Sequence, residues 1–485
     1  MELSVIHYIL SENMKTYIGK IHLKWCYNCN LPILGKKCDI CNTEALPVKL
    51  TPPGDARLGF RYDIDFINEC LEREFGAKSI EDGIILLNKL PGNLEAYEVI
   101  VDGIVKYILY YNEEKETWKI KLKLHGAYDL IEKGANKRIV KIKNDLLNIL
   151  KDKSTLLRPG IIEITNDIER GDDVIIVNED ERVVGVGLAM LSSNEIEKIE
   201  RGKIIKVRFF NKNFQNRKLE RYKLEEALNL MIEANNSVIY NYEKNAIGFI
   251  KNSYEKIKKP VIVAYSGGKD SLVTLILTLK ALKKENVEVI FIDTGLEFPE
   301  TLKNIEEVEN FFNIEIKRLE AENFWEKIKE YGIPSRDYRW CSEVCKLNPL
   351  KEYLKDREVL SFVGIRKYES FSRAKKRLIY RNTYIKNQIN ALPIFHWTAL
   401  HVWIYILKEG APYNKLYEKG FDRVGCYICP AMELGEMDRV RKLYPELWEK
   451  WENVLKEYAN KYKLPEDWIR KGLWRWKKFH PKDIW

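Results

Sequence analysis

The sequence lacks the features of several common classes of protein. It has no apolar run near the roughly 18 residues of a membrane span. It has no basic segment ahead of an apolar core at its start, and no internal repeat or low-complexity tract. Its six histidines form no metal-binding spacing. These absences predict a cytoplasmic protein that has no contact with membranes.

The composition is that of a multidomain globular protein. Hydrophobic residues make up 45% and charged residues 32% of the 485 positions, too apolar for disorder and too varied for a fibre. At about 100–200 residues per domain, this length predicts three or four domains. Basic residues exceed acidic ones by 81 − 72 = 9, so charge bears on partners only where it is clustered.

Turn residues and hydrophobic periodicity divide the chain into six segments. Pro52-Pro53-Gly54 marks the first boundary, and after Pro260 a strand, a glycine loop, a helix and a second strand form a βαβ unit. We expect a cysteine module (1–50), a small α+β domain (51–137), a β-barrel (138–215), a helical linker (216–259), a doubly wound parallel α/β domain (260–436) and a basic, tryptophan-rich helical tail (437–485).

Individual elements follow from the same patterns. Apolar residues at helical spacing predict a helix around Ile64–Phe75. Runs rich in β-branched and aromatic residues predict six strands at 105–111, 118–124, 161–164, 174–177, 183–188 and 204–209.

The loop Ser266-Gly267-Gly268-Lys269-Asp270-Ser271 joins the first strand of the α/β domain to its helix. Glycines allow the backbone to approach an oxyanion closely, the helix N-terminus offers N–H groups, and a lysine adds a cation for polyphosphate. The loop is not a Walker A motif, because the GxxxxGK[ST] spacing is missing. The alternative is an ordinary tight turn.

This loop resembles the pyrophosphate loop of the ATP pyrophosphatase (PP-loop) and adenosine-phosphosulfate reductase superfamily, whose fold is adenine nucleotide alpha-hydrolase-like. Three later stretches resemble the phosphoadenosine phosphosulfate (PAPS) reductase branch in the same order: Asp293–Thr301, Gly364–Ala374 and Leu392–Cys426. The resemblance implies a nucleotide domain over 260–436 with an adenine nucleotide at the carboxyl end of its sheet.

The resemblance also implies roles for individual residues. The loop residues 266–271 would bind the phosphates of ATP, with magnesium as the expected ion, and Lys269, Asp270 and Asp293 would be catalytic. Asp293, Thr294 and Gly295 would lie near the ribose or adenine. Gly364, Arg366 and Arg373 would face the anionic group, since guanidinium forks suit phosphate or sulfate. The alternative for both arginines is a surface ion pair.

The cysteines form two sets of four. Cys26, Cys29, Cys38 and Cys41 have the CxxC spacing of a tetrahedral zinc site and resemble a zinc ribbon; a redox role is the alternative. Cys341, Cys345, Cys426 and Cys429 follow the layout of family members that hold a 4Fe-4S cluster, although zinc or free thiols are alternatives. Cys70 lies on an apolar helix stripe and is predicted to be a packing thiol.

Two features indicate RNA as a partner. Segments such as Arg158-Pro159-Gly160, Gly171-Asp172 and Val184–Ala189 resemble a PUA domain, which implies binding of structured RNA, although any small β-domain needs similar turns. From Arg201 to Lys223, nine basic residues accompany Glu220 alone, with interleaved aromatics. Further basic clusters span 366–386 and 470–482. The alternative is a solvated face over ordinary core aromatics.

Three functions remain open from the sequence. The first is an ATP-dependent RNA-modifying transferase, with tRNA as the expected substrate, that adenylates a base and transfers sulfur with the aid of the cluster and a sulfur donor protein. The second is a sulfonucleotide reductase, an oxidoreductase acting on PAPS or adenosine phosphosulfate. The third is a non-catalytic RNA-binding nucleotide sensor. Lys269 resembles ATP-cleaving members, and the lack of a cysteine after Cys429 counts against the second.

Overall fold

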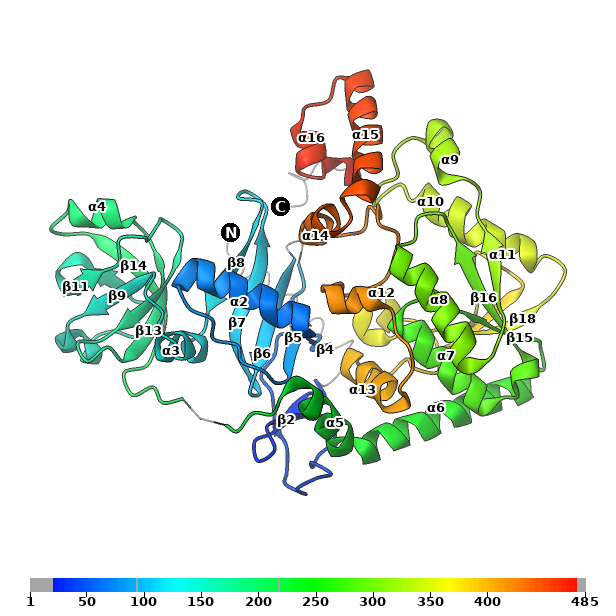
Figure 1. Ribbon diagram of the computed structural model, residues 1–485, viewed down its shortest axis with the longest axis horizontal. Helices are drawn as coiled ribbons and strands as arrows, with labels where there is room; N and C mark the ends of the chain where they lie inside the picture. The colour runs from blue at the N-terminus through cyan, green and yellow to red at the C-terminus, as the bar shows by residue number, and fades with distance from the viewer. Residues whose placement is uncertain (1–20, 93–94, 217–218, 478–485) are drawn as a thin grey trace. The chain divides into compact units, whose positions relative to one another are not determined.

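A computed structural model describes residues 21–92, 95–216 and 219–477 of the chain. These residues form two compact units, Ile21–Asn235 and the residues from Asn236 onward, here called the N-terminal and C-terminal units (Figure 1). The start of the predicted cysteine module and the end of the predicted tail lie outside the described residues. None of the helices described here is long and apolar enough to cross a membrane.

The N-terminal unit begins with a small three-stranded antiparallel sheet. Its strands, in the spatial order β2-β1-β3, are β1 (Lys24–Cys26), β2 (Leu31–Ile33) and β3 (Leu46–Pro47). Helix α5 (Leu224–Ala234) is tied to this sheet at its end. The buried Asn235 accepts a hydrogen bond from the Leu34 N–H over 2.8 Å and donates to the Pro32 carbonyl over 2.9 Å. The cysteine module is therefore bound to a segment about two hundred residues later in the chain.

A five-stranded antiparallel sheet with two helices follows. Its elements are β4 (Arg57–Leu58), α2 (Arg61–Phe75), β5 (Ile85–Lys89), β6 (Ala96–Val101), β7 (Ile104–Asn112), β8 (Thr117–Leu122) and α3 (Leu124–Glu132). The predicted helix is confirmed, because the apolar stripe of α2 and Cys70 are buried. Burial raises the pKa of the Cys70 thiol to about 11, as expected for a packing residue. The strand predicted at 118–124 ends at Leu122, since Leu124 already begins α3.

The third part of the N-terminal unit is a six-stranded sheet with one apolar core. In the spatial order β10-β14-β13-β12-β9-β11, only β9 and β12 pair in parallel. The elements are β9 (Ile139–Ile142), β10 (Thr155–Leu157), β11 (Ile161–Ile164), β12 (Asp173–Val177), β13 (Val183–Ala189), α4 (Ser193–Glu197) and β14 (Lys203–Phe210). All four strands predicted here are confirmed to within one residue at each end.

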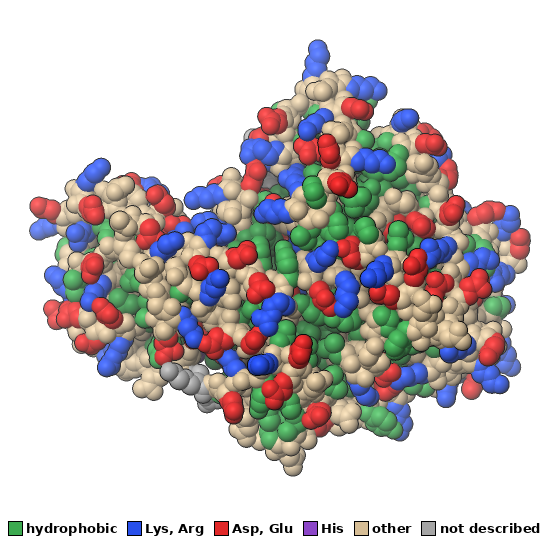
Figure 2. All heavy atoms as spheres, in the orientation of Figure 1, with side chains coloured by type: hydrophobic (Ala, Val, Ile, Leu, Met, Phe, Trp, Pro, Cys, Tyr) green, Lys and Arg blue, Asp and Glu red, His purple; other side chains and the backbone are tan. Residues whose placement is uncertain are grey.

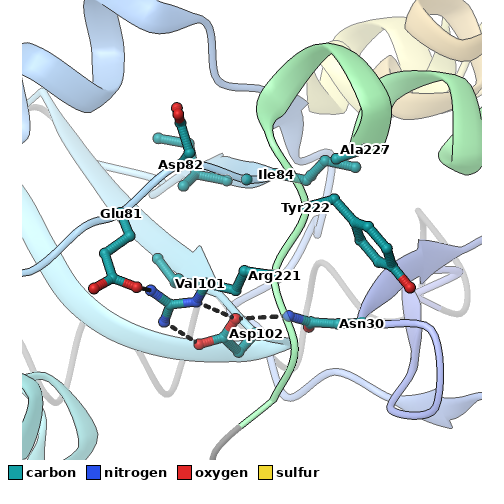
Figure 3. A pocket seen from close by; sticks show the side chains of 11 residues that line it. Asn30, Glu81, Asp82, Ile84, Val101, Asp102, Arg221, Tyr222 and Ala227 are labelled. Atoms are coloured by element: carbon teal, nitrogen blue, oxygen red, sulfur yellow. Dashed lines mark hydrogen bonds and ion pairs between the residues drawn. The ribbon is translucent and has the colours of Figure 1, made fainter.

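Asp102 is the centre of a buried ion-pair network in the N-terminal unit (Figure 3). Its carboxylate accepts hydrogen bonds from Arg221 at 2.6 and 3.2 Å, from Lys106 at 2.7 Å and from Asn30 at 3.0 Å. Lys106 also bonds to Asp129 over 2.6 Å. Burial opposes ionisation of Asp102, but Arg221 and Lys106 lower its pKa to about 2. The network joins the cysteine module, the second sheet and the segment before α5.

The C-terminal unit is a six-stranded doubly wound sheet in the order β17-β16-β15-β18-β20-β19. Five strands run in parallel and β19 pairs antiparallel with β20. The strands are β15 (Val261–Ala264), β16 (Val287–Asp293), β17 (Ile316–Glu320), β18 (Val359–Phe362), β19 (Ile379–Arg381) and β20 (Gln388–Ala391). The chain winds outward in both directions from β15, so the crevice at the carboxyl ends of β15 and its neighbours is the usual ligand position in such a sheet.

Helices cover this sheet and extend beyond it. They are α6 (Asn236–Ile257), α7 (Lys269–Ala281), α8 (Pro299–Phe312), α9 (Phe324–Tyr331), α10 (Trp340–Ser342), α11 (Asn348–Tyr353), α12 (Phe371–Ala374), α13 (Ala399–Glu409), α14 (Leu434–Leu443), α15 (Pro445–Tyr462) and α16 (Asp467–Arg470). In Figure 1, α7 and α8 lie in front of the strands. Three tryptophans of the predicted tail are packing residues: Trp448, Trp451 and Trp474 are buried, and the ring centroids of the last two lie 5.2 Å apart.

The network around Asp102 predicts a large effect on stability. In Asp102→Asn, Lys106 and Arg221 lose their shared charged partner, which is expected to cost about 3–5 kcal/mol, or about 6–20 °C in melting temperature for a unit of this size. Calorimetry of the full chain measures the shift. Asp82→Asn is the control, because its ion pair with Arg61 is half exposed and is worth less than about 1 kcal/mol. Equal shifts for both variants would contradict the assignment.

Candidate functional site

The predicted phosphate loop lies at the carboxyl end of β15, where α7 begins. Gly267 has φ +73°, and a Cβ there would lie 2.8 Å from Cγ2 of Thr301. Both the backbone angle and the space therefore require glycine at this position. Across the loop, the hydroxyl oxygens of Ser266 and Ser271 are 3.2 Å apart. The predicted strand, loop and helix are confirmed in this order.

Three charged side chains meet beneath this loop. Asp270 accepts a hydrogen bond from Nε of Arg366 over 2.6 Å and one from Nζ of Lys269 over 3.0 Å. Both cations are buried, with exposed fractions of 2% and 6%. Burial disfavours charge on Asp270, but Arg366 and Lys269 hold its pKa below the ordinary value. The structure thus brings the predicted site residue Arg366 to Lys269 and Asp270, which lie about a hundred residues earlier in the chain.

Tyr417 completes the surroundings of the loop and was not predicted from the sequence. Its hydroxyl oxygen accepts a hydrogen bond from the Lys269 N–H over 3.0 Å, and its ring lies 5.6 Å from the Lys269 ammonium. Tyr417 is buried and belongs to a stretch from the C-terminal half of the domain. In this structure the Lys269 ammonium is directed to Asp270 and this ring.

Gly364 brings the chain after β18 against the start of α7. A Cβ at Gly364 would lie 2.5 Å from the carbonyl oxygen of Asp270, which is too close for any other residue without a shift of backbone. Arg366 follows two residues later and reaches Asp270. Gly364 is therefore a packing residue that lets Arg366 reach the loop.

Arg373 lies apart from this group. Its guanidinium forms an ion pair with Glu369, and its side chain is 42% exposed. The backbone N–H of Arg373 also donates a hydrogen bond to the hydroxyl oxygen of Ser370, the cap of α12, over 3.2 Å. In this structure Arg373 has the surface ion pair that the sequence left open as its alternative.

Asp293 is the last residue of β16, next to the phosphate strand β15, and Thr294 and Gly295 follow it. Asp293 accepts a hydrogen bond from the Gly295 N–H over 2.9 Å. The half-buried Glu297 holds the segment, because it accepts bonds from the N–H of Thr294 over 3.0 Å and from its hydroxyl over 2.7 Å. Burial raises the pKa of Glu297. Glu297 was missed from the sequence, although its position three residues after Thr294 is typical of a capping pair.

The second cysteine set lines one cavity in the C-terminal unit. Cys341, Cys345, Cys426 and Cys429 surround a volume of about 40 Å³ together with Thr294, Arg339 and Lys346. Cys345 lies on a π-helical turn (Glu343–Leu347), a distortion frequent at functional sites. Burial raises the pKa of Cys341 to about 12 and that of Cys345 to about 11. These two thiols are thus desolvated, and a metal or the neighbouring Lys346 would favour their charged form.

The two cysteine sets differ in spacing. The sulfurs of Cys26, Cys29, Cys38 and Cys41 all lie within 4.8 Å of one another, close to the about 3.8 Å between ligands of a tetrahedral Zn–S₄ site. Among the described residues, no other group of three or more metal-binding side chains converges as closely. The first set therefore fits a single zinc ion. The sulfurs of the second set line one cavity but do not converge as closely.

Some basic residues of the segment 201–223, which was predicted to face RNA, form ion pairs within the protein. Arg221 is bound to Asp102 and Glu81 (Figure 3), and Arg208 forms an ion pair with Asp173. Phe214 packs edge-to-face on His125 at 4.8 Å. Two further basic positions, 217 and 218, lie outside the described residues. The local charge of 201–223 is therefore smaller in the folded protein than the sequence indicates.

Fold and site together define a nucleotide-binding α/β domain of the PP-loop type joined to a PUA domain. The model of the phosphoadenosine phosphosulfate reductase domain matches residues 260–432, and that of the PUA domain matches 138–210. The chain belongs to the phosphoadenosine phosphosulfate reductase family, as a member that also carries a PUA domain and a cysteine cluster typical of a zinc ribbon.

Three relatives illustrate the range of the similarity. The uncharacterized protein MJ0066 of Methanocaldococcus jannaschii is 68% identical, over 96% of this chain and 98% of that protein. A second protein of that organism, uncharacterized protein MJ0973, is 35% identical over 88% and 96%. The adenosine 5'-phosphosulfate reductase of Geobacillus kaustophilus is 31% identical over 39% of this chain and 81% of that enzyme. The protein is therefore related to a nucleotide-dependent enzyme over its C-terminal unit.

The zinc assignment predicts which cysteines hold the metal. Cys38→Ser is expected to remove about one zinc ion per chain, because three thiolates leave the tetrahedral site incomplete. Elemental analysis of purified full-length protein measures the loss. Cys70→Ser is the matched control, since Cys70 is buried outside the cluster, and its zinc content should stay unchanged. Full zinc content in Cys38→Ser would refute the site.

The close approach at Gly364 predicts a loss of nucleotide binding. In Gly364→Ala the added methyl group displaces the start of α7, so the Kd for MgATP is expected to rise more than about tenfold. Isothermal titration calorimetry of the full-length protein measures this Kd. Gly248→Ala is the control, because a Cβ there meets nothing within 4 Å and alanine favours the helix. Unchanged affinity in Gly364→Ala would show that the loop does not bind the nucleotide.

Proposed function

We propose that the protein is an ATP-dependent RNA sulfurtransferase and that its substrate is tRNA. The contact between Thr294 Oγ1 and Cys426 Sγ, at 3.7 Å, supports this proposal most directly. It joins the segment expected to hold the adenine nucleotide to the cavity lined by four thiols. The Tyr427 N–H also donates to the Leu296 carbonyl over 3.1 Å. The PUA domain in the same chain supports RNA as the substrate.

The proposed reaction has two substitutions. A carbonyl oxygen of the base attacks the α-phosphorus of ATP, which forms a C–O–P link and releases pyrophosphate. Sulfide-level sulfur, supplied by a donor protein, then attacks the base carbon that carries the adenylated oxygen. A C–S bond forms, the C–O bond breaks and AMP leaves. Lys269 and Arg366 would stabilise the phosphate charge together with magnesium. Asp270 would hold these two cations in place before the nucleotide binds.

We assign a cofactor role to the second cysteine set. Cys341, Cys345, Cys426 and Cys429 would hold a 4Fe-4S cluster, which would supply an iron–sulfur centre beside the nucleotide segment. Lys346 would balance the thiolate charge, because the neighbouring Cys426 raises the pKa of this lysine. Through its contact with Cys426, Thr294 would hold the thiol cavity next to the segment expected to bind the nucleotide.

A second candidate is reduction of a sulfonucleotide. The similarity to an adenosine 5'-phosphosulfate reductase over 81% of that enzyme favours it. The two candidates differ in what becomes of the nucleotide, since a reductase releases sulfite from the sulfonucleotide, whereas a sulfurtransferase cleaves ATP and requires RNA.

Mass spectrometry of nucleosides tests the proposal. A deletion strain is complemented with the wild type, Lys269→Ala or Cys426→Ser, and its tRNA is digested and analysed. We expect one thiolated nucleoside to be present with the wild type and to fall at least about a hundredfold with either variant, since each removes a group used in one of the two substitutions. Cys70→Ser is the matched control for loss of a thiol and should retain the nucleoside.

Three other results would contradict parts of this proposal. A nucleoside profile that is the same in the deletion strain and the wild type would refute sulfur transfer to RNA. Release of sulfite from adenosine phosphosulfate by the purified protein, lost in Cys426→Ser, would establish the reductase instead. Anaerobically purified protein that contains zinc but no iron at the second cysteine set would refute the role of the cluster.

A further inference from the structure

An exposed basic segment follows the nucleotide site in the C-terminal unit. Residues 371–386, which we call the basic hairpin, comprise α12, β19 and the turn toward β20. They contain six basic residues and no acidic residue. Elsewhere, the face of the molecule in Figure 2 shows basic and acidic side chains interspersed. The hairpin is therefore a local concentration of one sign of charge.

Cations and aromatic rings share the surface of the basic hairpin. Lys375, Lys376, Arg377 and Lys386 are exposed. The ammonium of Lys375 lies 4.3 Å from the ring centroid of Phe371, and that of Lys376 lies 4.7 Å from the ring of Tyr380. Tyr384 is 73% exposed, although aromatic rings are usually buried. An exposed ring beside uncovered positive charge suits stacking of a base and binding of its phosphate.

Two arginines of the basic hairpin form ion pairs. Arg373 forms an ion pair with Glu369, and Arg381 forms one with Glu358 at 2.5 Å. Lys375, Lys376 and Arg377 lie between these two arginines in the sequence and are all exposed. They form the largest run of exposed cations in the basic hairpin.

The hairpin is close to the proposed site of chemistry. The hairpin begins at Phe371, five residues after Arg366, whose guanidinium donates a hydrogen bond to Asp270 of the phosphate loop. Five residues of extended chain span at most about 18 Å. The start of the basic hairpin therefore lies within this distance of Arg366, on the same unit as the phosphate loop.

We propose that the basic hairpin binds the single-stranded part of the RNA substrate and leads the target base to the nucleotide. This inference rests on the proposed function, because it takes RNA as the substrate. RNA fits better than an acidic protein, since exposed aromatic rings offer stacking faces for unpaired bases. The PUA domain would bind structured RNA, while the hairpin would hold the nucleotide to be modified.

Binding of bulk tRNA to the full-length protein tests the hairpin without requiring activity. The triple variant Lys375→Ala/Lys376→Ala/Arg377→Ala is expected to weaken binding at least tenfold. It should also reduce the slope of log K against log salt by about 2, because three single-strand phosphate contacts are lost. Tyr384→Ala is expected to weaken tRNA binding about fivefold or more, whereas Tyr384→Phe, which keeps an aromatic ring, should bind tRNA like the wild type. The affinity for MgATP should remain that of the wild type.

A matched triple variant separates a local effect from a change of net charge. Lys244→Ala/Lys251→Ala/Lys256→Ala removes three exposed lysines of α6 and should leave tRNA affinity unchanged. Equal weakening in both triple variants would overturn the proposal. Unchanged binding in the hairpin variant would also overturn it and would assign the charges to an acidic protein partner. That outcome leaves sulfur transfer intact, whereas a nucleoside profile that is the same in the deletion strain and the wild type, with normal tRNA binding, would refute only the proposed chemistry.

Discussion

The C-terminal unit depends on one buried arrangement of charge, in which Asp270 lies between Lys269 and Arg366. Burying charges is unfavourable unless they are paired, and here one carboxylate is shared by two cations. The pairing joins the loop after β15 to the chain after β18, on either side of the point from which the sheet winds in both directions. One positive charge remains in excess, so polyphosphate would find a site whose donors are already oriented, which is the condition for electrostatic stabilisation without reorganisation. The close packing at Gly364 follows from the need to bring Arg366 to this point.

The N-terminal unit is organised by the same principle around a different carboxylate. Asp102 binds side chains from three segments that are separate in the sequence, and each bond orients one of them: Asn30 beside the first cysteine set, Lys106 in the second sheet and Arg221 before α5. The zinc module is too small to bury a large core of its own. Its attachment to this network and to Asn235 therefore accounts for its definite position within the unit.

Local patterns predicted local structure well. The strand, loop and helix of the phosphate loop, the four strands of the PUA sheet and the zinc cysteines all follow from periodicity, glycine position and ligand spacing, which act over a few residues. Contacts between distant segments were not predictable in this way. Tyr417 reaches Lys269 across 148 positions, and Arg221 reaches Asp102 across 119. The second of these explains why counting charge along 201–223 overestimated its exposed charge, whereas the cations at 375–377 are exposed in the structure.

The place of β19 at the end of the sheet has a consequence for the free protein. In the sheet order of the described residues it is the last strand, and the apolar Leu378 and Ile379 beside it are exposed. An open apolar edge is a template for pairing with the same edge of another molecule. When two copies approach, their lysines and arginines at 375–377 meet like charge, so repulsion opposes that pairing. A bound polyanion would cancel the repulsion, and the tendency to self-associate is therefore governed by how much of this charge is neutralised.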